Sequence, residues 1–455
     1  MLQFWLSNYE NVLMLAPTGR AAHKLKTETD WADTSTIARF VCMNKNSNYD
    51  NDGYVINTFG EKVPTGRQTL ILVDEVSMLN FSEAVDLFRL IEDCTIVFLG
   101  DINQLAPIEA GCFLSEILKL NQLYPLPIAY LKKNMRTNVQ ALADNADRIL
   151  DGTLSPKLHF DNDFIFDFTF CGDANGQKIG VQDADMLTCE KAFDYYMNYL
   201  QQGFTPSDIM LLCPVRTGCA GVISLNSYFQ NHLNPIAQKA TAFTDAEGNI
   251  CYSDKGYECD GFVLNGIKVR IMDRLMQTKN DSTREWVRYR DNDPDKEEID
   301  RGTGLFNGDV GTIIRYYKSY NYSSMYRSVS AILLQMDDGR CFLIPNVPDM
   351  YENLCLGYAV TVHKAQGSEA SCVIVVLPES SMSTRWMRKP FLTKNLLYTA
   401  VTRAKQSVNI IGSQNAFQLC LASEQSFGAA TVAEDVFNST LFRQQLNQKS
   451  NTIAP

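Results

Sequence analysis

The stretch LILVDEVSML, residues 70 to 79, decides the fold. Its apolar run, Leu70 to Val73, is typical of a strand buried on both faces of a parallel sheet. Two carboxylates, Asp74 and Glu75, follow directly, and a helical pattern continues through SEAVDLFRLIED. A strand, then acidic residues, then a helix predict an α/β domain. In such a domain the ligand lies at the carboxyl ends of the strands.

The same pattern occurs on both sides of this stretch. In VLMLAPTGRAAHKL, residues 12 to 25, an apolar run ends at Pro17 and a helical pattern begins at Thr18. Downstream, the apolar run Thr95 to Leu99 ends at Gly100-Asp101. Strand, helix and strand at this spacing predict βαβ units with right-handed parallel crossovers. The N-terminal third is therefore predicted to hold a mostly parallel sheet.

A polar stretch, NKNSNYDNDGYVINTFGEKVPTG, separates two of these runs. Its Asp52-Gly53 dipeptide favours a tight hairpin turn. We expect an exposed β-hairpin at about residues 44–64, inserted in the α/β domain.

After Gly152 the sequence changes character. A connector is followed by a helix from about 184 to 202 and by the strand IMLLCPVR. The hairpin pattern AILLQM-DDG-RCFLIP and its surroundings predict a small barrel of short strands at 306–352. The α/β pattern returns with CVIVVLP and SVNIIG, so the barrel is inserted in a second α/β domain. We interpret the charged stretch Asp281 to Arg301 as a solvated loop rather than a binding surface.

Composition narrows the class of protein. The 455 residues have a formal net charge of -11, which excludes a uniformly basic coat but not a local phosphate-binding groove. No apolar stretch approaches ~18 residues, so no transmembrane helix is predicted, and the first residues lack the basic start of a signal peptide. The 13 cysteines are scattered without a CxxC. We therefore expect reduced thiols in a cytoplasmic protein.

The acidic pair suggests phosphoryl chemistry. In nucleotide hydrolysis one carboxylate holds Mg²⁺ through water and a neighbour orients the attacking water. Asp74 suits the first role and Glu75 the second, although an acidic start of a helix would explain both residues equally. Gln104, just beyond the next strand, could sense a terminal phosphate or its water. Alone it would be a polar turn before Pro107, but both motifs follow consecutive strands of one sheet.

Two further motifs lie far downstream, YAVTVHKAQGSEAS at 358–371 and LLYTAVTRAKQSVNIIG at 396–412. Arg403 in the second motif suits an arginine finger that a second domain delivers to a phosphate. A surface salt bridge is the alternative for this arginine.

The ordered motifs resemble the RecD-like family of superfamily 1 helicases, whose members move 5′ to 3′ on single-stranded DNA. The segments that carry the resemblance are APTGRAA, TSTIAR, VDEVSML, GDINQLAPIEAG, CPVRTGCAG, FNGDVG, VTVHKAQGSE and YTAVTRAK. The resemblance implies an α/β fold with two RecA-like P-loop NTPase motor domains. They would occupy 1–153, with the inserted β-hairpin, and 154–413, with an inserted SH3-like β-barrel. A helical tail would follow at 414–455.

The resemblance also implies roles for individual residues. The nucleotide and its Mg²⁺ would be met by Asp74, Glu75, Gln104, Arg136, Gly367, Glu369 and Arg403. Asp74 would bind the metal, Glu75 would activate water and Glu369 would meet the ribose. The DNA path would be lined by Pro17, Thr18, Arg20, Thr36, Thr361 and His363. His363 would otherwise be a core histidine. Thr137 departs from the family pattern, which usually has Gln after the arginine.

One expected motif is absent. No Gly-Lys dipeptide occurs in the sequence, so there is no G-x-x-x-x-G-K-[ST] loop to grip a triphosphate. In the family this loop precedes the APTGRAA strand, and only MLQFWLSNYEN stands before that strand here. We expect a truncation that removed the Walker A motif, and the alternative is a relic that does not hydrolyse ATP.

The expected function is an ATP-dependent DNA helicase acting in DNA repair or recombination on single-stranded DNA and duplex forks. Its cofactors would be ATP and Mg²⁺, and it would be inactive without the loop. No membrane association is expected, and a monomer is consistent with the sequence. The alternatives are a nucleic-acid-binding module without ATPase activity and the helicase part of a larger relaxase or nuclease. Codons upstream of Met1 would distinguish them.

Overall fold

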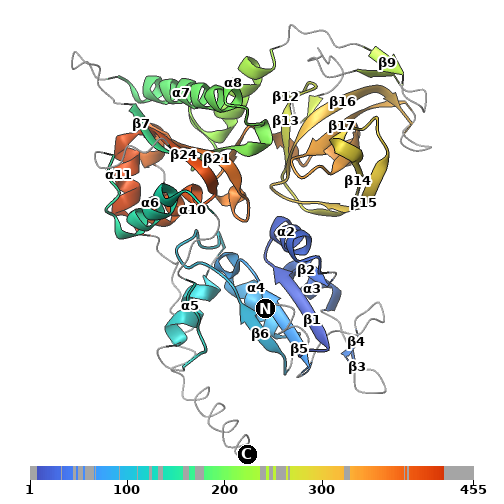
Figure 1. Cartoon of the computed structure of the whole chain (residues 1–455), viewed down its shortest axis with the longest axis vertical. Helices are drawn as coiled ribbons and strands as arrows, with labels where there is room; N and C mark the ends of the chain where they lie inside the picture. Colours follow the sequence, from blue (N-terminus) through green and yellow to red (C-terminus); the bar gives the residue numbers. More distant parts are fainter. Residues whose placement is uncertain are drawn as a thin grey trace, which may run out of the picture. The chain divides into compact units, whose positions relative to one another are not determined.

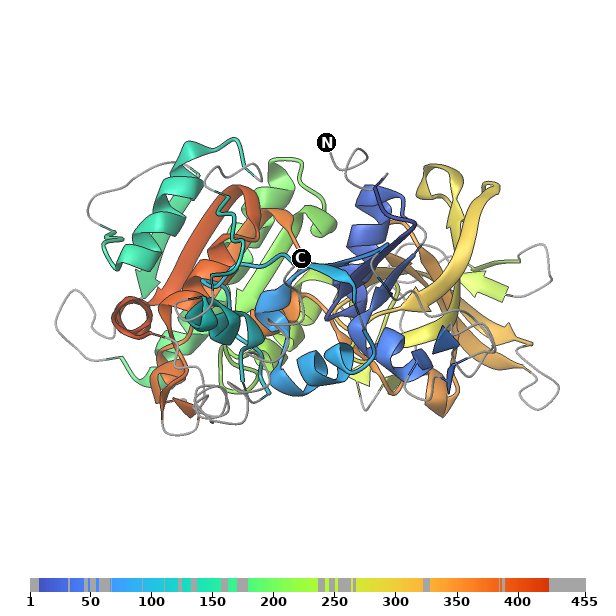
Figure 2. The same ribbon diagram turned by 90° about the horizontal axis from the view of Figure 1, so that it is seen from below.

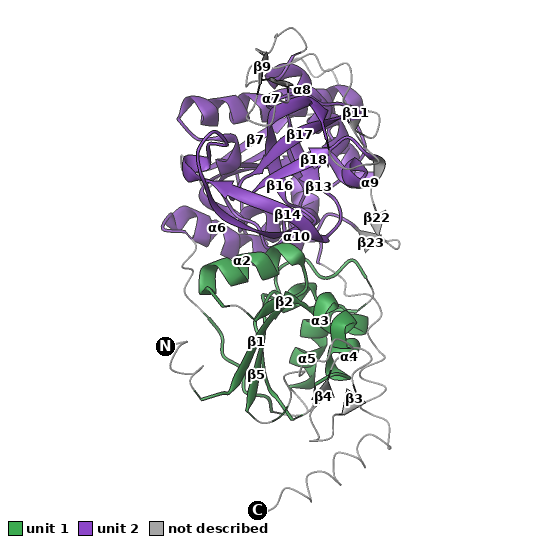
Figure 3. Cartoon of the chain, turned by 90° about the vertical axis from the view of Figure 1, so that its right-hand side faces the viewer, with its two compact units in different colours: residues 1–133, 425–455 green, residues 134–424 purple. Residues whose placement is uncertain are grey.

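The computed structural model describes residues 8–31, 33–44, 48–49, 55–56, 66, 68–91, 93–109, 111–121, 125–131, 137–156, 163–169, 179–235, 242–244, 250–252, 263–264, 267–321, 328–383, 385–386 and 389–424. The chain forms two compact units (Figure 3). Unit 1 contains residues 1–133 and 425–455, and unit 2 contains residues 134–424. No helix among the described residues is both long and apolar enough to cross a membrane.

Unit 1 is built on a four-stranded parallel sheet with the order β2-β1-β5-β6 (Figure 1). The strands are β1 (Asn11–Ala16), β2 (Thr34–Thr36), β5 (Thr69–Val73) and β6 (Thr95–Phe98). The helices are α2 (Gly19–Thr29), α3 (Ile37–Asn44), α4 (Phe81–Phe88) and α5 (Phe113–Leu120). The predicted strands at 12–16, 70–73 and 95–99 are thus confirmed, and the short polar strand β2 was not predicted.

The core of unit 1 comes from the apolar runs that predicted the strands. Leu15, Ile71 and Val73 are fully buried, together with Leu79 and Leu87 from the segments that follow β5. An antiparallel pair, β3 (Asn48–Tyr49) and β4 (Val55–Ile56), lies within the predicted hairpin. The Asp52-Gly53 turn itself lies outside the described residues.

Unit 2 contains a five-stranded parallel sheet with the order β20-β8-β21-β24-β7. The strands are β7 (Phe164–Thr169), β8 (Ile209–Cys213), β20 (Ala359–Thr361), β21 (Ala370–Leu377) and β24 (Ala404–Ser413). Five helices accompany the sheet (Figure 2), namely α6 (Gln140–Asp151), α7 (Val181–Gln201), α8 (Val222–Leu233), α10 (Lys394–Val401) and α11 (Gln414–Ala422). Separate parallel sheets in the two units agree with the predicted two-domain α/β class.

The boundary between the units differs from the expected one at residue 153. The structure divides the chain at 133/134, because α6 packs against α10 and β24 of unit 2. The sequence does not reveal this, since an amphipathic helix can cover either of two α/β sheets.

An antiparallel sheet, the β module, is inserted between β8 and β20. Its path is β15-β14-β18-β17-β16-β10-β9, and β13 pairs with both β16 and β19. The strands are β9 (Ala242–Thr244), β10 (Ile250–Tyr252), β13 (Arg274–Gln277), β14 (Asp281–Tyr289), β15 (Glu298–Leu305), β16 (Val310–Tyr320), β17 (Val329–Met336), β18 (Cys341–Pro345) and β19 (Leu354–Leu356). The β module is thus wider than the expected barrel at 306–352, whose SH3-like character stays a prediction.

The charged stretch from Asp281 to Arg301 was interpreted wrongly as a loop. Most of it forms the paired strands β14 and β15. Opposite charges meet along this hairpin, as in Arg288 with Asp300 (3.7 Å) and Arg290 with Glu297. A dense mixture of charges is therefore compatible with a sheet whose cross-strand neighbours have opposite signs.

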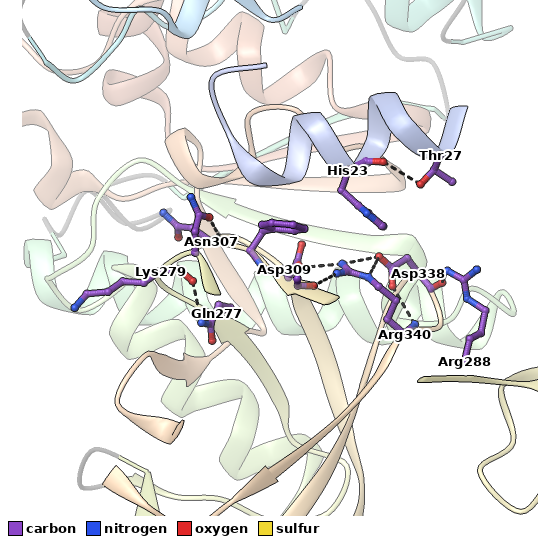
Figure 4. A network of polar contacts seen from close by, with 12 residues as sticks. His23, Thr27, Gln277, Lys279, Arg288, Asn307, Asp309, Asp338 and Arg340 are labelled. Carbon is purple, nitrogen blue, oxygen red and sulfur yellow. Dashed lines mark hydrogen bonds and ion pairs between the residues drawn. The ribbon is translucent and has the colours of Figure 1, made fainter. Parts of the chain in front are cut away.

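A buried arginine organises the turn of the predicted FNGDVG motif. The Arg340 guanidinium, 1% exposed, donates to Asp309 Oδ2 (2.8 Å), Asp338 Oδ2 (2.7 Å) and the Gly304 carbonyl (2.6 Å), as Figure 4 shows. Asp309 Oδ2 also accepts the Phe306 N–H (3.0 Å). The neighbouring carboxylates raise the pKa of Arg340 against the opposing effect of its burial. The turn therefore depends on one ionic network.

Replacing Arg340 with Met should lower the free energy of unfolding by about 3–5 kcal/mol, because it leaves Asp309 charged and buried. Urea unfolding followed by tryptophan fluorescence measures this. The matched control is Arg301→Met, which removes an ion pair of a 79% exposed side chain and should change stability by less than about 1 kcal/mol. Equal effects of the two substitutions would contradict the assignment.

Candidate nucleotide and nucleic-acid sites

In unit 1 the strand ends are joined by backbone hydrogen bonds at the carboxyl edge of the sheet. The Asp74 N–H donates to the Leu15 carbonyl (2.8 Å), and the Val76 N–H donates to the Leu99 carbonyl (2.9 Å). These bonds fix the turn that carries Asp74 and Glu75 against both neighbouring strands. The predicted position of the two carboxylates, at the edge where parallel sheets bind ligands, agrees with this geometry.

Glu75 has an unusual backbone. Its φ is 51° and its ψ is 40°, the left-handed conformation that residues other than glycine rarely adopt. Its N–H donates to Asp74 Oδ1 (2.9 Å). Such strained residues concentrate at functional sites, where the surrounding structure holds them. The strain therefore supports a functional role for this turn.

Gln104 follows β6, the strand that pairs with β5 in the sheet. A Cβ on Gly100, at the end of β6, would lie 3.1 Å from the Ser77 nitrogen, so glycine permits the close approach of the two strand ends. Gln104 is 7% exposed, and its Oε1 has no hydrogen-bond partner in the described part of the chain. An unpaired buried oxygen costs about 1–3 kcal/mol. A bound water or ligand would remove that cost.

The donors at this edge fit a Mg²⁺-bound nucleotide in part. Asp74 offers a hard carboxylate oxygen, and Gln104 offers an amide oxygen to water or phosphate. The described residues contain no group of three or more His, Cys, Asp or Glu that would hold a metal alone. A Mg²⁺ ion here would therefore take further ligands from phosphate and water. The chain lacks the Gly-Lys loop that would grip the phosphates.

Three predicted DNA-path threonines share one local geometry. Each lies at or just after the end of a parallel strand, and its Oγ1 accepts the N–H of the residue three positions later. The pairs are Thr18 with Ala21 (3.2 Å), Thr36 with Arg39 (3.1 Å) and Thr361 with Lys364 (3.3 Å). The hydroxyl proton can still donate to a phosphate oxygen, so each cap is a preorganised contact.

His363 follows Thr361 in unit 2. Its ring stacks on Phe391, with 5.7 Å between centroids, and burial lowers its pKa to about 4. Burial also lowers the pKa of Lys364, and the guanidinium of Arg216 lowers it further. Sequence reasoning missed Lys364 and Arg216. The signal in the sequence was their position, because Arg216 and Lys364 each lie three residues after the end of a strand, β8 or β20, within a quoted motif.

Arg403 is fully buried in unit 2. Its Nε donates to the Thr399 carbonyl (3.1 Å) and its Nη1 to the Ser368 carbonyl (3.2 Å). This second bond brings Arg403 beside the turn of Gly367, whose φ is +75°. Glu369, from the same turn, pairs with Lys405 (2.5 Å). Three predicted nucleotide-binding residues thus lie together, and none of the described contacts of Arg403 is a surface salt bridge.

The remaining predicted residues are placed as follows. Pro17 and Arg20 are half-buried and flank Thr18 at the start of α2. Arg136 lies outside the described residues. Thr137, which follows it, donates from Oγ1 to the Lys405 carbonyl (2.7 Å). That bond ties the chain after Arg136 to the start of β24, two residues after Arg403.

Comparisons with known proteins agree with the motif order. A family model described as an AAA domain matches residues 1–165, and a UvrD-like helicase C-terminal domain matches residues 356–411. The ATP-dependent RecD2 DNA helicase of Deinococcus radiodurans is 26% identical over 90% of this chain and 44% of its own length. The RecBCD enzyme subunit RecD of Mycolicibacterium smegmatis is 23% identical over 89% of this chain and 62% of its own length. The chain thus spans less than two thirds of both relatives.

A solved structure of the Pif1 helicase from Bacteroides, in complex with ADP-AlF3 and ssDNA, aligns with 95% of this chain and 88% of its own. The TM-score is 0.45 and the identity is 15%.

The low pKa of His363 predicts acid sensitivity. Below about pH 6.5 the unfolded chain binds a proton that the buried ring does not, so stability should fall as the pH drops towards about 4, by up to about 3 kcal/mol. His363→Asn should remove this part of the pH dependence. Urea unfolding of both proteins between pH 4 and pH 8 (roughly the range in which histidine titrates) measures it. Parallel stability curves would contradict the prediction.

Proposed function

Because the chain belongs to the RecD-like superfamily 1 helicases, we propose that it is the motor of an ATP-dependent DNA helicase that translocates 5′ to 3′ on single-stranded DNA. The observation that carries the proposal is the turn at the end of β5. It carries Asp74 and the strained Glu75, and the segment after the neighbouring strand β6 carries Gln104, whose side-chain oxygen is buried and unpaired in the described structure. ATP hydrolysis between the RecA-like domains would drive the movement.

The chain's own residues suit distinct tasks in this reaction. Bound ATP with Mg²⁺ supplies the phosphoryl group and the charge that polarises it. Asp74 would hold the metal, and Glu75 would accept the proton of the attacking water. Gln104 would orient that water through its unpaired oxygen. Arg136 and Arg403 would meet the γ-phosphate, and Glu369 would meet the ribose.

Single-stranded DNA would be held by hydroxyl and cationic groups at strand ends. Thr18, Thr36 and Thr361 offer hydroxyl protons from capped turns, and Pro17, Arg20 and His363 would line the same path. Arg216 and Lys364 add positive charge at the ends of β8 and β20. Phosphate contacts of this kind bind without sequence preference, which suits a translocating motor. Duplex forks would be opened as the motor advances past the β3–β4 hairpin.

A module that binds nucleic acid without hydrolysing ATP is the second candidate. The observation that favours it is the absence of any Gly-Lys dipeptide from the 455 residues.

We predict that residues 1–455 alone show no DNA-stimulated ATP hydrolysis, because the sequence has no G-x-x-x-x-G-K-[ST] loop to cradle the phosphates. Release of inorganic phosphate at saturating oligonucleotide measures turnover, and binding of labelled single-stranded DNA in the same preparation provides the control. Robust hydrolysis would show that another segment replaces the loop. Failure to bind DNA would instead contradict the proposed function.

In any form of the protein that hydrolyses ATP, Glu75→Gln should reduce turnover by roughly 10²–10⁴-fold, because the amide cannot accept the proton of water. DNA affinity should persist, since Glu75 lies outside the DNA path. The matched control is Glu109→Gln, at an exposed carboxylate that accepts a hydrogen bond from Asn80 in the same unit. Loss of DNA binding by the Glu75 variant would assign that residue to folding.

A further inference from the structure

The β module and the parallel sheet of unit 2 meet at a buried carboxylate. Asp273 is 0% exposed and directly precedes β13 of the β module. Its oxygens accept hydrogen bonds from three separate segments of the chain. The donors are Gln230 Nε2 (2.6 Å), Asn234 Nδ2 (2.8 Å), the Arg270 N–H (2.8 Å) and the Tyr358 hydroxyl (3.0 Å).

The four donors to Asp273 lie in different parts of the fold of unit 2. Gln230 lies in α8 and Asn234 directly follows it, whereas Arg270 lies in the segment that leads into β13. Tyr358 belongs to neither, because it is the residue that precedes β20. Asp273 therefore connects α8, the segment before β13 and the strand that ends at Thr361.

Residues 354 to 361 pass from one sheet into the other within a few positions. Leu356 pairs with Leu275 of β13, and Ala359 pairs with Leu211 of β8. The link is tight, since a Cβ on Gly357 would lie 2.8 Å from the Leu275 carbonyl carbon. Beyond the link, Asn226 of α8 bonds both the N–H and the carbonyl of Ala359 at 2.9 Å. The side-chain amide thus takes the place of a neighbouring strand at this edge.

This arrangement fixes the start of β20, and the strand is only three residues long. Its far end carries Thr361, and His363 lies two residues further on. Because this short strand is bonded to β8 on one edge and to the Asn226 amide on the other, we expect a displacement of Tyr358 to be passed to these residues rather than absorbed.

We propose that Tyr358 and Asp273 are positioning residues for single-stranded DNA, because they hold β20 so that Thr361 and His363 meet the phosphates. The inference rests on the proposed function, since it requires that these two residues contact DNA. The β module, which contains Asp273, thereby sets the geometry of a DNA contact in the parallel sheet.

The test compares the affinities of tyrosine variants of residues 1–455 for a labelled oligothymidylate of about 20 nucleotides. Tyr358→Phe deletes only the hydroxyl that Asp273 accepts. It should weaken binding by about three- to tenfold, the effect of one hydrogen bond on an equilibrium constant. The matched control is Tyr199→Phe, which deletes a buried hydroxyl bonded to Ser407 (2.7 Å) and Asn409 (2.9 Å) in the same unit. Its affinity should equal that of the wild type.

A double-mutant cycle tests whether Tyr358 acts through the end of β20. His363→Asn should weaken binding, and adding Tyr358→Phe should weaken it no further. Equal affinities of the two tyrosine variants, additive losses in the cycle, or an unchanged affinity of His363→Asn would each overturn the inference. If the wild type binds no oligonucleotide, the proposed function fails too. If it binds and Tyr358→Phe binds equally well, only the inference fails.

Discussion

The structure of unit 2 depends on how the chain rejoins its parallel sheet after the inserted β module. β8 and β20 are neighbours in that sheet, yet the whole β module lies between them in the sequence. Closing so long a loop has an entropic cost that only specific contacts at its base can offset.

Asp273 supplies such contacts. A buried carboxylate is stable only when its oxygens are satisfied, and the four donors around Asp273 are in place only when the excursion closes correctly. Burial still raises its pKa despite these four hydrogen bonds. The Asp273 carboxylate therefore favours the one arrangement in which α8, the segment before β13 and Tyr358 come together, whatever net stability it contributes.

Sequence analysis predicted correctly those elements whose structure depends on residues close together in the chain. Apolar runs ended by polar residues predicted β1, β5 and β6. For β1 and β5 the reason is burial, because a strand buried on both faces has little choice of composition. The same rule placed Asp74 and Glu75 at the carboxyl end of β5 and Gln104 after the neighbouring strand β6. The resemblance named Gly367 and Arg403 separately as nucleotide-binding residues, and only the structure shows that Arg403 bonds the Ser368 carbonyl next to Gly367.

The failures occurred where partners lie far apart in the sequence. The hairpin of β14 and β15 was interpreted as a loop, because its charges are balanced by residues across the strand rather than beside them. The extent of the β module was underestimated, since β9, β10 and β13 are short, and β10 and β13 pair with β16, which lies far from them in the sequence. The strained backbone of Glu75, the unpaired oxygen of Gln104 and the proximity of Arg216 to Lys364 are likewise tertiary facts. No local pattern encodes them, yet they give the candidate sites their chemistry.

The burial of Arg403 bears on its proposed role as an arginine finger. Its guanidinium donates to the neutral carbonyls of Thr399 and Ser368. A hydrogen bond to an ionised phosphate is roughly twice as strong as one to a neutral acceptor. A γ-phosphate within reach could therefore compete for these donors, whereas water would gain little by doing so. The carbonyls would hold the long side chain in one conformation until then, which reduces the entropy lost when it engages the phosphate. A buried resting position is thus compatible with a finger, provided that the turn of Gly367 and Ser368 releases the guanidinium as the phosphate binds.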